Sequence, residues 1–197
     1  MFKRMSTLVR RPDHDRATFS RLWERHAAPV SGLPRVRGYI QNHIEEEFSA
    51  AAPIRADGFV ELLWDSPEDM AAAFASEAAR PMVEDEPGFL GHGSGYALHT
   101  ALPLRDTPGG KLIFAVLGDD GAAIEAEAAD LVGLTASALD TVSSLIAKSG
   151  MTPPQPVDAF LHLWFEDLET ARTAALRLAT RKDMTAGIYR VRTIRFV

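Results

Sequence analysis

A near-repeat of one short passage constrains the fold of this chain more than any other feature. The segments FVELLWDSPEDMA (59–71) and FLHLWFEDLETA (160–171) align at an offset of 101 residues. In each, a run of apolar and aromatic residues typical of a strand leads into an acidic stretch typical of a helix start. Because this passage recurs, the 197-residue chain is predicted to contain two copies of one structural unit.

The first hundred residues alternate strand and helix patterns in the order βαββαβ. Asp15 and Ser66 are suitable helix N-caps, Pro67 suits a first helical position, and Pro29 is expected to end the first helix. The expected strands are 2–11, 36–48, 59–64 and 95–104, and the expected helices are 15–29 and 66–79. This order is that of a ferredoxin-like unit.

The rest of the chain follows the same order, with one ambiguous segment. Propensity would extend the helix that follows the strand 111–118 through LTASALDTVSSLIAKS (134–149), whereas the repeat requires a strand near 140–148. We follow the repeat, and expect the last strand in GIYRVRTIRFV. The predicted domains are 1–105 and 111–197, joined by the linker 106–110.

Two such units suggest how the molecule buries its apolar surface. Each four-stranded sheet would be covered by helices on one face and bare on the other. The predicted α+β fold therefore has two fused ferredoxin-like units packing sheet to sheet, as a pseudo-dimeric α+β barrel within one chain. The fused chain could in addition form a homodimer.

Composition excludes several classes of protein. Without cysteine, the chain has no thiolate zinc site and no cysteine nucleophile, and it fits a cytoplasmic protein. The net charge of −6 argues against nucleic acid as a partner, and the lack of an 18-residue apolar run argues against a membrane span. The motifs of zinc proteases, serine hydrolases and dinucleotide-binding proteins are missing, so no metal site is expected.

Residues 1–100 resemble the EthD family, a branch of the dimeric α+β barrel superfamily. The resemblance rests on RRPD, Phe19-x3-Trp23-x2-His26, LPRVRGYIQNH (33–43), DGFVELLW (57–64), Glu84 and Glu86. It implies a barrel with a ligand cavity between sheet and helices. The superfamily includes lactone isomerases, polyketide cyclases, cofactor-free monooxygenases and haem proteins, so no cofactor is expected, with haem as the alternative. The second copy lacks counterparts of Trp23 and His26.

His26 and Glu61 are the candidate catalytic residues. A neutral imidazole at the end of the first helix could take a proton from an acidic carbon or hydroxyl group, whereas the alternative is a half-buried histidine bonded near the helix end. Glu61 lies in an otherwise apolar strand. It is either a second acid/base group or the partner of an arginine such as Arg4 or Arg37.

The candidate substrate-binding residues are mostly aromatic: Phe19, Trp23, Asn42, Trp64 and Tyr96. Phe19 and Trp23 would either form core or wall the space beside His26. Strand alternation places Asn42 on the apolar face of its strand, so it is expected to reach toward a ligand on the helix side. The glycine-rich segment 84–96 is predicted to be a flexible flap over the cavity.

Three functions remain open from the sequence. The first is a cofactor-independent enzyme that isomerises or cyclises a hydrophobic, oxygenated small molecule by proton transfer. The second is a non-catalytic binder of a small hydrophobic ligand. The third is an oxidoreductase of the monooxygenase or haem type.

Overall fold

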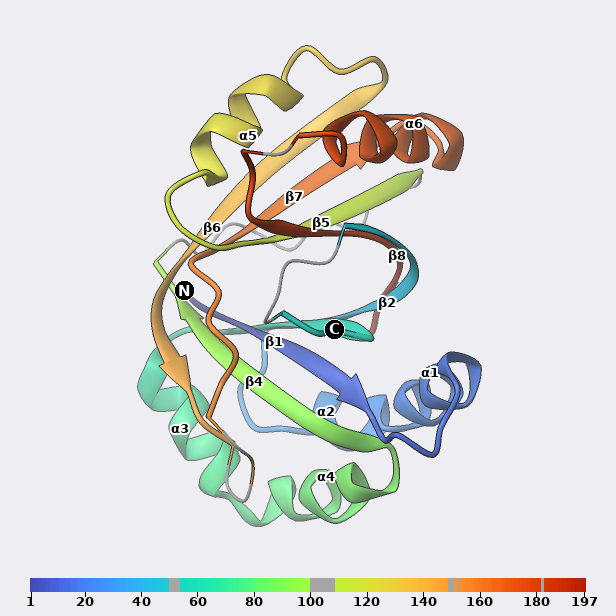
Figure 1. Ribbon diagram of the computed structural model, residues 1–197. Helices are drawn as coiled ribbons and strands as arrows, with labels where there is room; N and C mark the ends of the chain where they lie inside the picture. The colour runs from blue at the N-terminus through green and yellow to red at the C-terminus, as the bar shows by residue number, and fades with distance from the viewer. Residues whose placement is uncertain (50–53, 100–108, 149–150, 152, 182) are drawn as a thin grey trace.

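A computed structural model describes residues 1–49, 54–99, 109–148, 151, 153–181 and 183–197 (Figure 1). The first half of the chain carries four strands and its helices in the order that the sequence predicts. Its elements are β1 (Phe2–Arg10), α1 (Arg16–Arg25), α2 (Ala27–Ser31), β2 (Gly38–Ser49), β3 (Gly58–Trp64), α3 (Pro67–Ala75), η1 (Glu77–Ala79), α4 (Arg80–Asp85), η2 (Glu86–Gly88) and β4 (Leu90–Leu98).

The second half has four strands with one helix after the first and one after the third. Its elements are β5 (Gly110–Val116), α5 (Gly121–Ala128), β6 (Leu134–Ile146), β7 (Ala159–Phe165), α6 (Leu168–Leu178) and β8 (Ala186–Arg195). The ambiguous segment 134–149 is therefore a strand over most of its length, as the repeat requires. Pairing of β6 with both β4 and β7 outweighs its local helix propensity.

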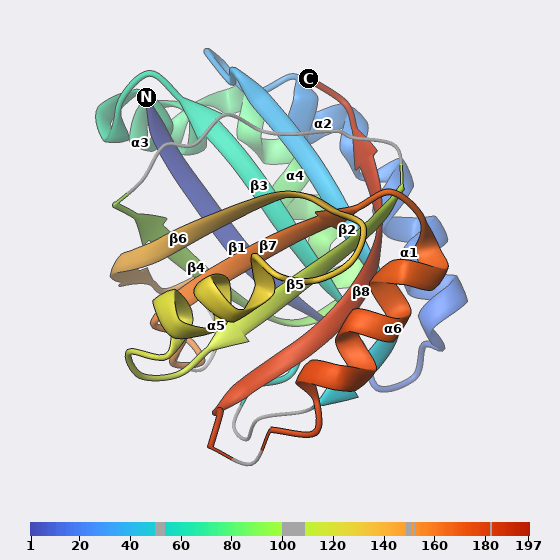
Figure 2. The same ribbon diagram turned by 90° about the horizontal axis from the view of Figure 1, so that it is seen from above.

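The eight strands close into one antiparallel barrel in the order β1-β3-β2-β8-β5-β7-β6-β4 (Figure 2). Within the first half the order is β4-β1-β3-β2, and within the second it is β6-β7-β5-β8. The halves join edge to edge, β2 with β8 and β4 with β6. Closure therefore pairs both edges of each of the eight strands in the described part of the chain. The α+β class and the barrel are confirmed.

The helices cover the outside of the barrel on two opposite sides (Figure 1). α1 to α4 cover the first-half strands, and α5 and α6 cover the second-half strands. Apolar side chains gather in three clusters: one under each helix layer and one inside the barrel. Most strands are thus buried on both faces over much of their length, which explains the fully buried patterns of β3, β5 and β7. β6 differs, because most of its residues are half-buried or exposed.

Pro29 does not end the first helical segment. α1 ends at Arg25, and α2 runs from Ala27 through Pro29 to Ser31. Pro29 is tolerated because it lies in the first turn of α2, where a backbone N–H has no intrahelical acceptor.

The flap predicted for 84–96 is wrong over residues 90–96, which belong to β4. The glycines there allow close packing: a Cβ on Gly95 would lie 2.9 Å from Nη2 of Arg4 and 3.0 Å from Cβ of Ile146. The expected strand 95–104 is shifted, and its residues 100–104 lie outside the described part, as do residues 106–108 of the linker. None of the helices in the described ranges is long and apolar enough to cross a membrane.

Candidate functional site

A small cavity lies in the first half, between the helix layer and the outer face of its strands. Its volume is about 50 Å³. Strand residues and helix residues both face it, and most of them are apolar. The lining residues are Arg4, Ser6, Leu8, Trp23, His26, Val30, Tyr39, Val60, Leu62, Phe74, Met82, Glu86, Phe89, Leu90 and Lys148.

His26 is the C-cap residue of α1 and is 4% exposed. Its Nδ1 lies 2.8 Å from Oδ2 of Asp85, and its ring lies 4.9 Å from that of Phe89. A carboxylate only accepts hydrogen bonds, so Nδ1 carries the proton and the lone pair is on Nε2. Burial lowers the pKa of His26, although Asp85 opposes this shift. The imidazole is therefore neutral at pH 7 and able to accept a proton.

Arg4 is a second polar group in this cavity, and it was not among the site residues predicted from the sequence. Its side chain points outward from β1 and is 7% exposed as a residue. Its guanidinium stacks over Phe74, 4.8 Å from the ring centroid, while Nε has no hydrogen-bond partner among the described residues. Burial lowers the pKa of Arg4 to about 10, so it stays charged at pH 7. The sequence did contain a signal for a buried charge, because Lys3 and Arg4 place one positive charge on each face of the first strand.

An ion pair between Lys148 and Glu86 borders the cavity. The pair joins the segment just after the second-half strand β6 to the short helix η2 of the first half. Both side chains are largely buried, at 18% and 16% exposed. The charge of Glu86 also favours the charged form of Arg4. Glu86, one of the two acidic residues in the family resemblance, therefore does belong to the cavity.

The predicted aromatic wall is partly present. Trp23 lines the cavity, and Phe19 packs on it with ring centroids 5.5 Å apart. Trp64 lies in the same apolar cluster, and its Nε1 donates a hydrogen bond to the carbonyl oxygen of Pro34 at 3.3 Å. Trp23 therefore forms the wall and Phe19 packs against it, whereas Trp64 packs on Phe74, another residue of the cavity lining.

Asn42 and Tyr96 do not reach this cavity. Both point into the barrel, on the other face of the sheet: Asn42 Nδ2 donates to Glu61 at 2.9 Å, and Tyr96 packs in the interior apolar cluster. The prediction that Asn42 faces the helices is wrong. The apolar face of β2 turned out to line the barrel. Its polar neighbour Gln41 faces the helices and donates to the carbonyl oxygen of Trp23 at 2.8 Å.

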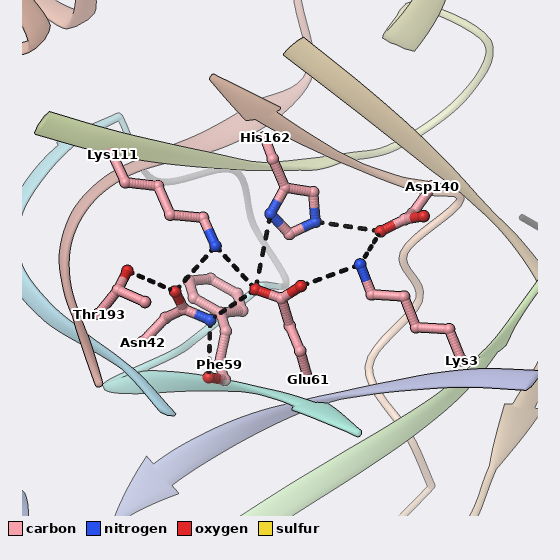
Figure 3. Close-up of polar contacts among 8 residues, drawn as sticks. All are labelled: Lys3, Asn42, Phe59, Glu61, Lys111, Asp140, His162 and Thr193. Carbon is pink, nitrogen blue, oxygen red and sulfur yellow. Dashed lines mark hydrogen bonds and ion pairs between the residues drawn. The ribbon is translucent and has the colours of Figure 1, made fainter. Parts of the chain in front are cut away.

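Glu61 also lies inside the barrel, in a buried set of polar side chains (Figure 3). We call this set the interior cluster. Glu61 is 2.9 Å from Lys3 and 2.7 Å from Lys111, and these lysines replace the arginine partners expected from the sequence. The cluster draws residues from both halves of the chain: Lys3, Asn42, Glu61, Lys111, Asp140, His162 and Thr193.

The other contacts of the interior cluster link the two halves. Lys3 is 2.5 Å from Asp140, and Nε2 of His162 is 3.2 Å from the same carboxylate. Asn42 accepts hydrogen bonds from Lys111 at 3.0 Å and from Thr193 at 2.9 Å. Two lysines and two carboxylates balance when His162 is neutral, and burial lowers the pKa of His162.

Glu61 is held ionised by its partners. Burial alone would raise its pKa, but Lys111 and Lys3 outweigh that effect and hold the pKa well below the usual value. The sheet separates Glu61 from the cavity that contains His26, so the two candidate catalytic groups do not converge. Of these two candidates, His26 lines the cavity and Glu61 does not.

The cavity sets limits on what it can hold. In the described ranges, no group of three His, Cys, Asp or Glu side chains could hold a metal ion. At about 50 Å³ the cavity is far below the 300–1,000 Å³ typical of cofactor pockets, so in this conformation it does not fit a haem. A carboxylate-sized group or a few water molecules would fit.

Comparison with known proteins agrees with this architecture. Residues 11–93 match the EthD domain family, which confirms the resemblance over these residues. They include His26, Trp23 and Glu86 of the cavity wall. No curated protein sequence matches the chain.

Several solved structures share the fold over nearly the whole chain. An anthrone oxidase-like protein superposes with a TM-score of 0.58 at 10% identity, covering 98% of this chain and 92% of that one. A protein provisionally named a monooxygenase, from Fusobacterium nucleatum, gives 0.54 at 10% identity, with 100% and 92% covered. One provisionally named a chlorite dismutase gives 0.51 at 13% identity, with 98% and 95% covered. These likenesses show a shared fold.

Proposed function

We propose, from the EthD domain match over residues 11–93 and the cavity beside His26, that this protein is a small-molecule enzyme. It would isomerise or cyclise a hydrophobic, oxygenated metabolite by moving a proton. The observation that carries the proposal is His26 itself. Its Nδ1 is bonded to Asp85, and its Nε2 has no partner in the described part of the chain. A fixed, neutral imidazole beside an apolar cavity is suited to general-base catalysis.

The roles of the surrounding residues follow from their positions. Asp85 would hold the ring and stabilise the imidazolium that forms when Nε2 takes the proton. Trp23 would offer a flat apolar surface to the ligand. We infer that His26 then returns the proton at a second position, so that the reaction consumes no reductant or oxidant. No cofactor is required by such a step.

A ligand larger than the present cavity needs space to be made. We infer that the segment Arg80–Gly88 moves to provide it, because these short helices carry Met82 and Glu86 on the cavity side. Their outer side faces solvent, with Val83 56% exposed. The shift would break the ion pair of Glu86 with Lys148, whereas Asp85 has to keep its hydrogen bond to His26 for the ring to stay oriented.

We further propose that the halves are tandem ferredoxin-like domains, 1–105 and 111–197, joined by residues 106–110. Each shows the element order βαββαβ and a matching strand order, which supports this division. α5, in the place of α1, offers no counterpart of Trp23 or His26. The second domain would therefore complete the barrel as a built-in partner, and the fused chain could still form a homodimer.

Two other functions share the same site. A non-catalytic binder is favoured by the mainly apolar lining of the cavity. An oxidoreductase is suggested by the names of the structural neighbours, an anthrone oxidase-like protein and a protein provisionally called a monooxygenase. Both would act on the kind of ligand proposed above.

Hydrogen–deuterium exchange tests proton transfer without knowledge of the natural substrate. Anthrone, an enolisable ketone, would be incubated with the protein in D₂O, and the loss of its acidic C–H signals followed by NMR. We expect faster exchange with the wild-type protein and none above background with His26→Gln. His99→Gln, which changes an exposed histidine, is the matched control.

The outcomes separate the three functions. Exchange that persists in His26→Gln would exclude His26 as the base. Binding of anthrone without exchange would favour the binder. Oxygen consumption during the incubation, measured with an electrode, would favour the oxidoreductase.

A further inference from the structure

The cavity contains a buried positive charge that the protein does not neutralise. Arg4 is 93% buried by residue area, yet no carboxylate forms an ion pair with it in the described ranges. The nearest acidic contributor, Glu86, is already paired with Lys148. Burying a cation without a hydrogen-bonded partner costs free energy of folding. A ligand that supplies the missing partner would remove this cost.

We propose that Arg4 is an anion-binding residue, and that the ligand of this cavity carries a carboxylate. This rests on the proposed function and narrows its substrate class. The guanidinium and His26 both line the same space of about 50 Å³, so one ligand can contact both. A carboxylate would accept hydrogen bonds from the guanidinium of Arg4, which has no hydrogen-bonded partner in the described part of the chain.

The packing around Arg4 fixes the guanidinium for this role. Phe74 lies under its face at 4.8 Å, and Gly95 leaves the room that a larger side chain would take from Nη2. Nε itself is covered by protein atoms, so a planar acceptor would bind at the Nη groups or displace the side chains that cover Nε. Lys148 adds a second positive charge at the border of the cavity, although Glu86 offsets it.

Charge balance favours one negative ligand group. Arg4 and Lys148 contribute two positive charges, Glu86 one negative charge, and His26 is neutral. Asp85 lies outside the cavity lining and is 54% exposed at its side chain, so water screens its charge. One anionic oxygen group would neutralise the remainder.

Binding of acetate, with the near-isosteric neutral acetamide as control, tests this at pH 7 and constant ionic strength. The readout is the ¹H–¹⁵N signal of the Arg4 Nε–H, assigned through its own side-chain correlations. Acetate is expected to shift this signal saturably, and acetamide to bind at least about tenfold more weakly, since a charge-assisted hydrogen bond contributes about 1.5–3 kcal/mol. Equal binding, or no response of the Arg4 signal, would overturn the proposal.

Three variants sharpen the result. Arg4→Met keeps the length and apolar stem of the side chain, and is expected to weaken acetate binding at least about tenfold. Lys148→Met is expected to weaken it less, because Lys148 is already paired. His99→Gln, at an exposed histidine that does not line the cavity, should retain acetate binding. If Arg4→Met does not fold, the wild-type comparison of acetate with acetamide still decides.

The failure of this proposal and that of the proposed function look different. If acetate binds through Arg4 but no proton exchange occurs, the anion-site proposal is supported and the proposed enzymatic function is contradicted. Proton exchange that depends on His26, with no acetate response at Arg4, would do the reverse.

Discussion

Glu61 and His162 occupy equivalent positions in the two halves of the chain and face each other inside the barrel. Glu61 lies opposite Met5 of β1, and His162 lies opposite Ile113 of β5. Nδ1 of His162 is 3.9 Å from Oε1 of Glu61 (Figure 3). Two residues that are 101 positions apart in the sequence, and equivalent in the two halves, thus meet inside the barrel.

The same correspondence extends to the rest of the interior cluster. Lys3 and Lys111 hold matching registers, opposite Leu63 and Trp164. Asn42 and Asp140 likewise lie opposite Phe59 and Phe160. Each half contributes a lysine, an amide or carboxylate, and a glutamate or histidine. The cluster therefore joins the halves through matched positions whose charges differ.

Removing the charge of Glu61 should destabilise the fold strongly. Glu61→Gln keeps the shape but leaves Lys3 and Lys111 with one carboxylate, Asp140, between them. We expect the free energy of unfolding to fall by about 3–5 kcal/mol, as for other broken buried ion pairs. Urea denaturation measures this.

A surface pair serves as the control for Glu61→Gln. Asp65→Asn breaks the exposed pair with Arg37, and should leave the free energy of unfolding close to that of the wild type. If the Glu61→Gln variant has the same urea midpoint of unfolding as the wild type, the interior cluster contributes little to stability.

His43 should make the protein less stable as the pH falls below about 6.5. Its Nδ1 is 2.8 Å from Ser20 Oγ, and its Nε2 is 2.9 Å from Gln41 Oε1. The amide of Gln41 donates through Nε2 to the carbonyl oxygen of Trp23, so Oε1 accepts from His43. Ser20 then donates to Nδ1, and the ring is held neutral. Burial, with the positive charge of Arg192, lowers the pKa of His43 to about 4.

The sign of this pH dependence follows from proton binding. Between pH 6.5 and 4 the unfolded chain protonates His43 and the folded chain does not, so stability is lost as the pH falls and levels off near 4. The full loss from this group is about 3 kcal/mol. Urea melts at pH 7 and pH 5 should show a smaller difference for His43→Gln than for the wild type. Equal differences would mean that His43 protonates alike in both states.

The sequence predicted the order of elements well and the faces of the strands poorly. The strand β6 was expected because the repeat required it, against local propensity. Alternation placed Asn42 and Gln41 on opposite faces of β2 but could not say which face lines the barrel, because both faces are buried. Arg4 was not predicted as a cavity residue, because the side chains around it come from helices and strands far away in the chain.

The carboxylate of Asp85 should raise the pKa of His26 and so oppose the lowering by burial. Removing this carboxylate in Asp85→Asn is expected to lower the pKa further, because the charge that favours the imidazolium is lost. The Cε1–H signal of His26 in an NMR titration reports the pKa directly. Glu84→Gln, on the same short helix but without a contact to His26, is the control. An unchanged or higher pKa in Asp85→Asn would show that Asp85 does not orient the ring in solution.

Gly58 is the point at which the cavity wall is most sensitive to a single methyl group. A Cβ at this position would overlap Cζ3 of Trp23 and lie 2.7 Å from its Cη2. Gly58→Ala is therefore expected to displace the indole, to lower the free energy of unfolding by about 1–3 kcal/mol, and to alter tryptophan fluorescence.

Gly88→Ala is the matched control, because nothing lies within 4 Å of its added methyl group. Both variants reduce backbone freedom in the unfolded chain in the same way, so their difference isolates the clash with Trp23. Since Trp23 also lines the cavity beside His26, the displaced indole should weaken anthrone binding in Gly58→Ala only. Equal stability and fluorescence in the two variants would mean that the indole does not lie against β3 in solution.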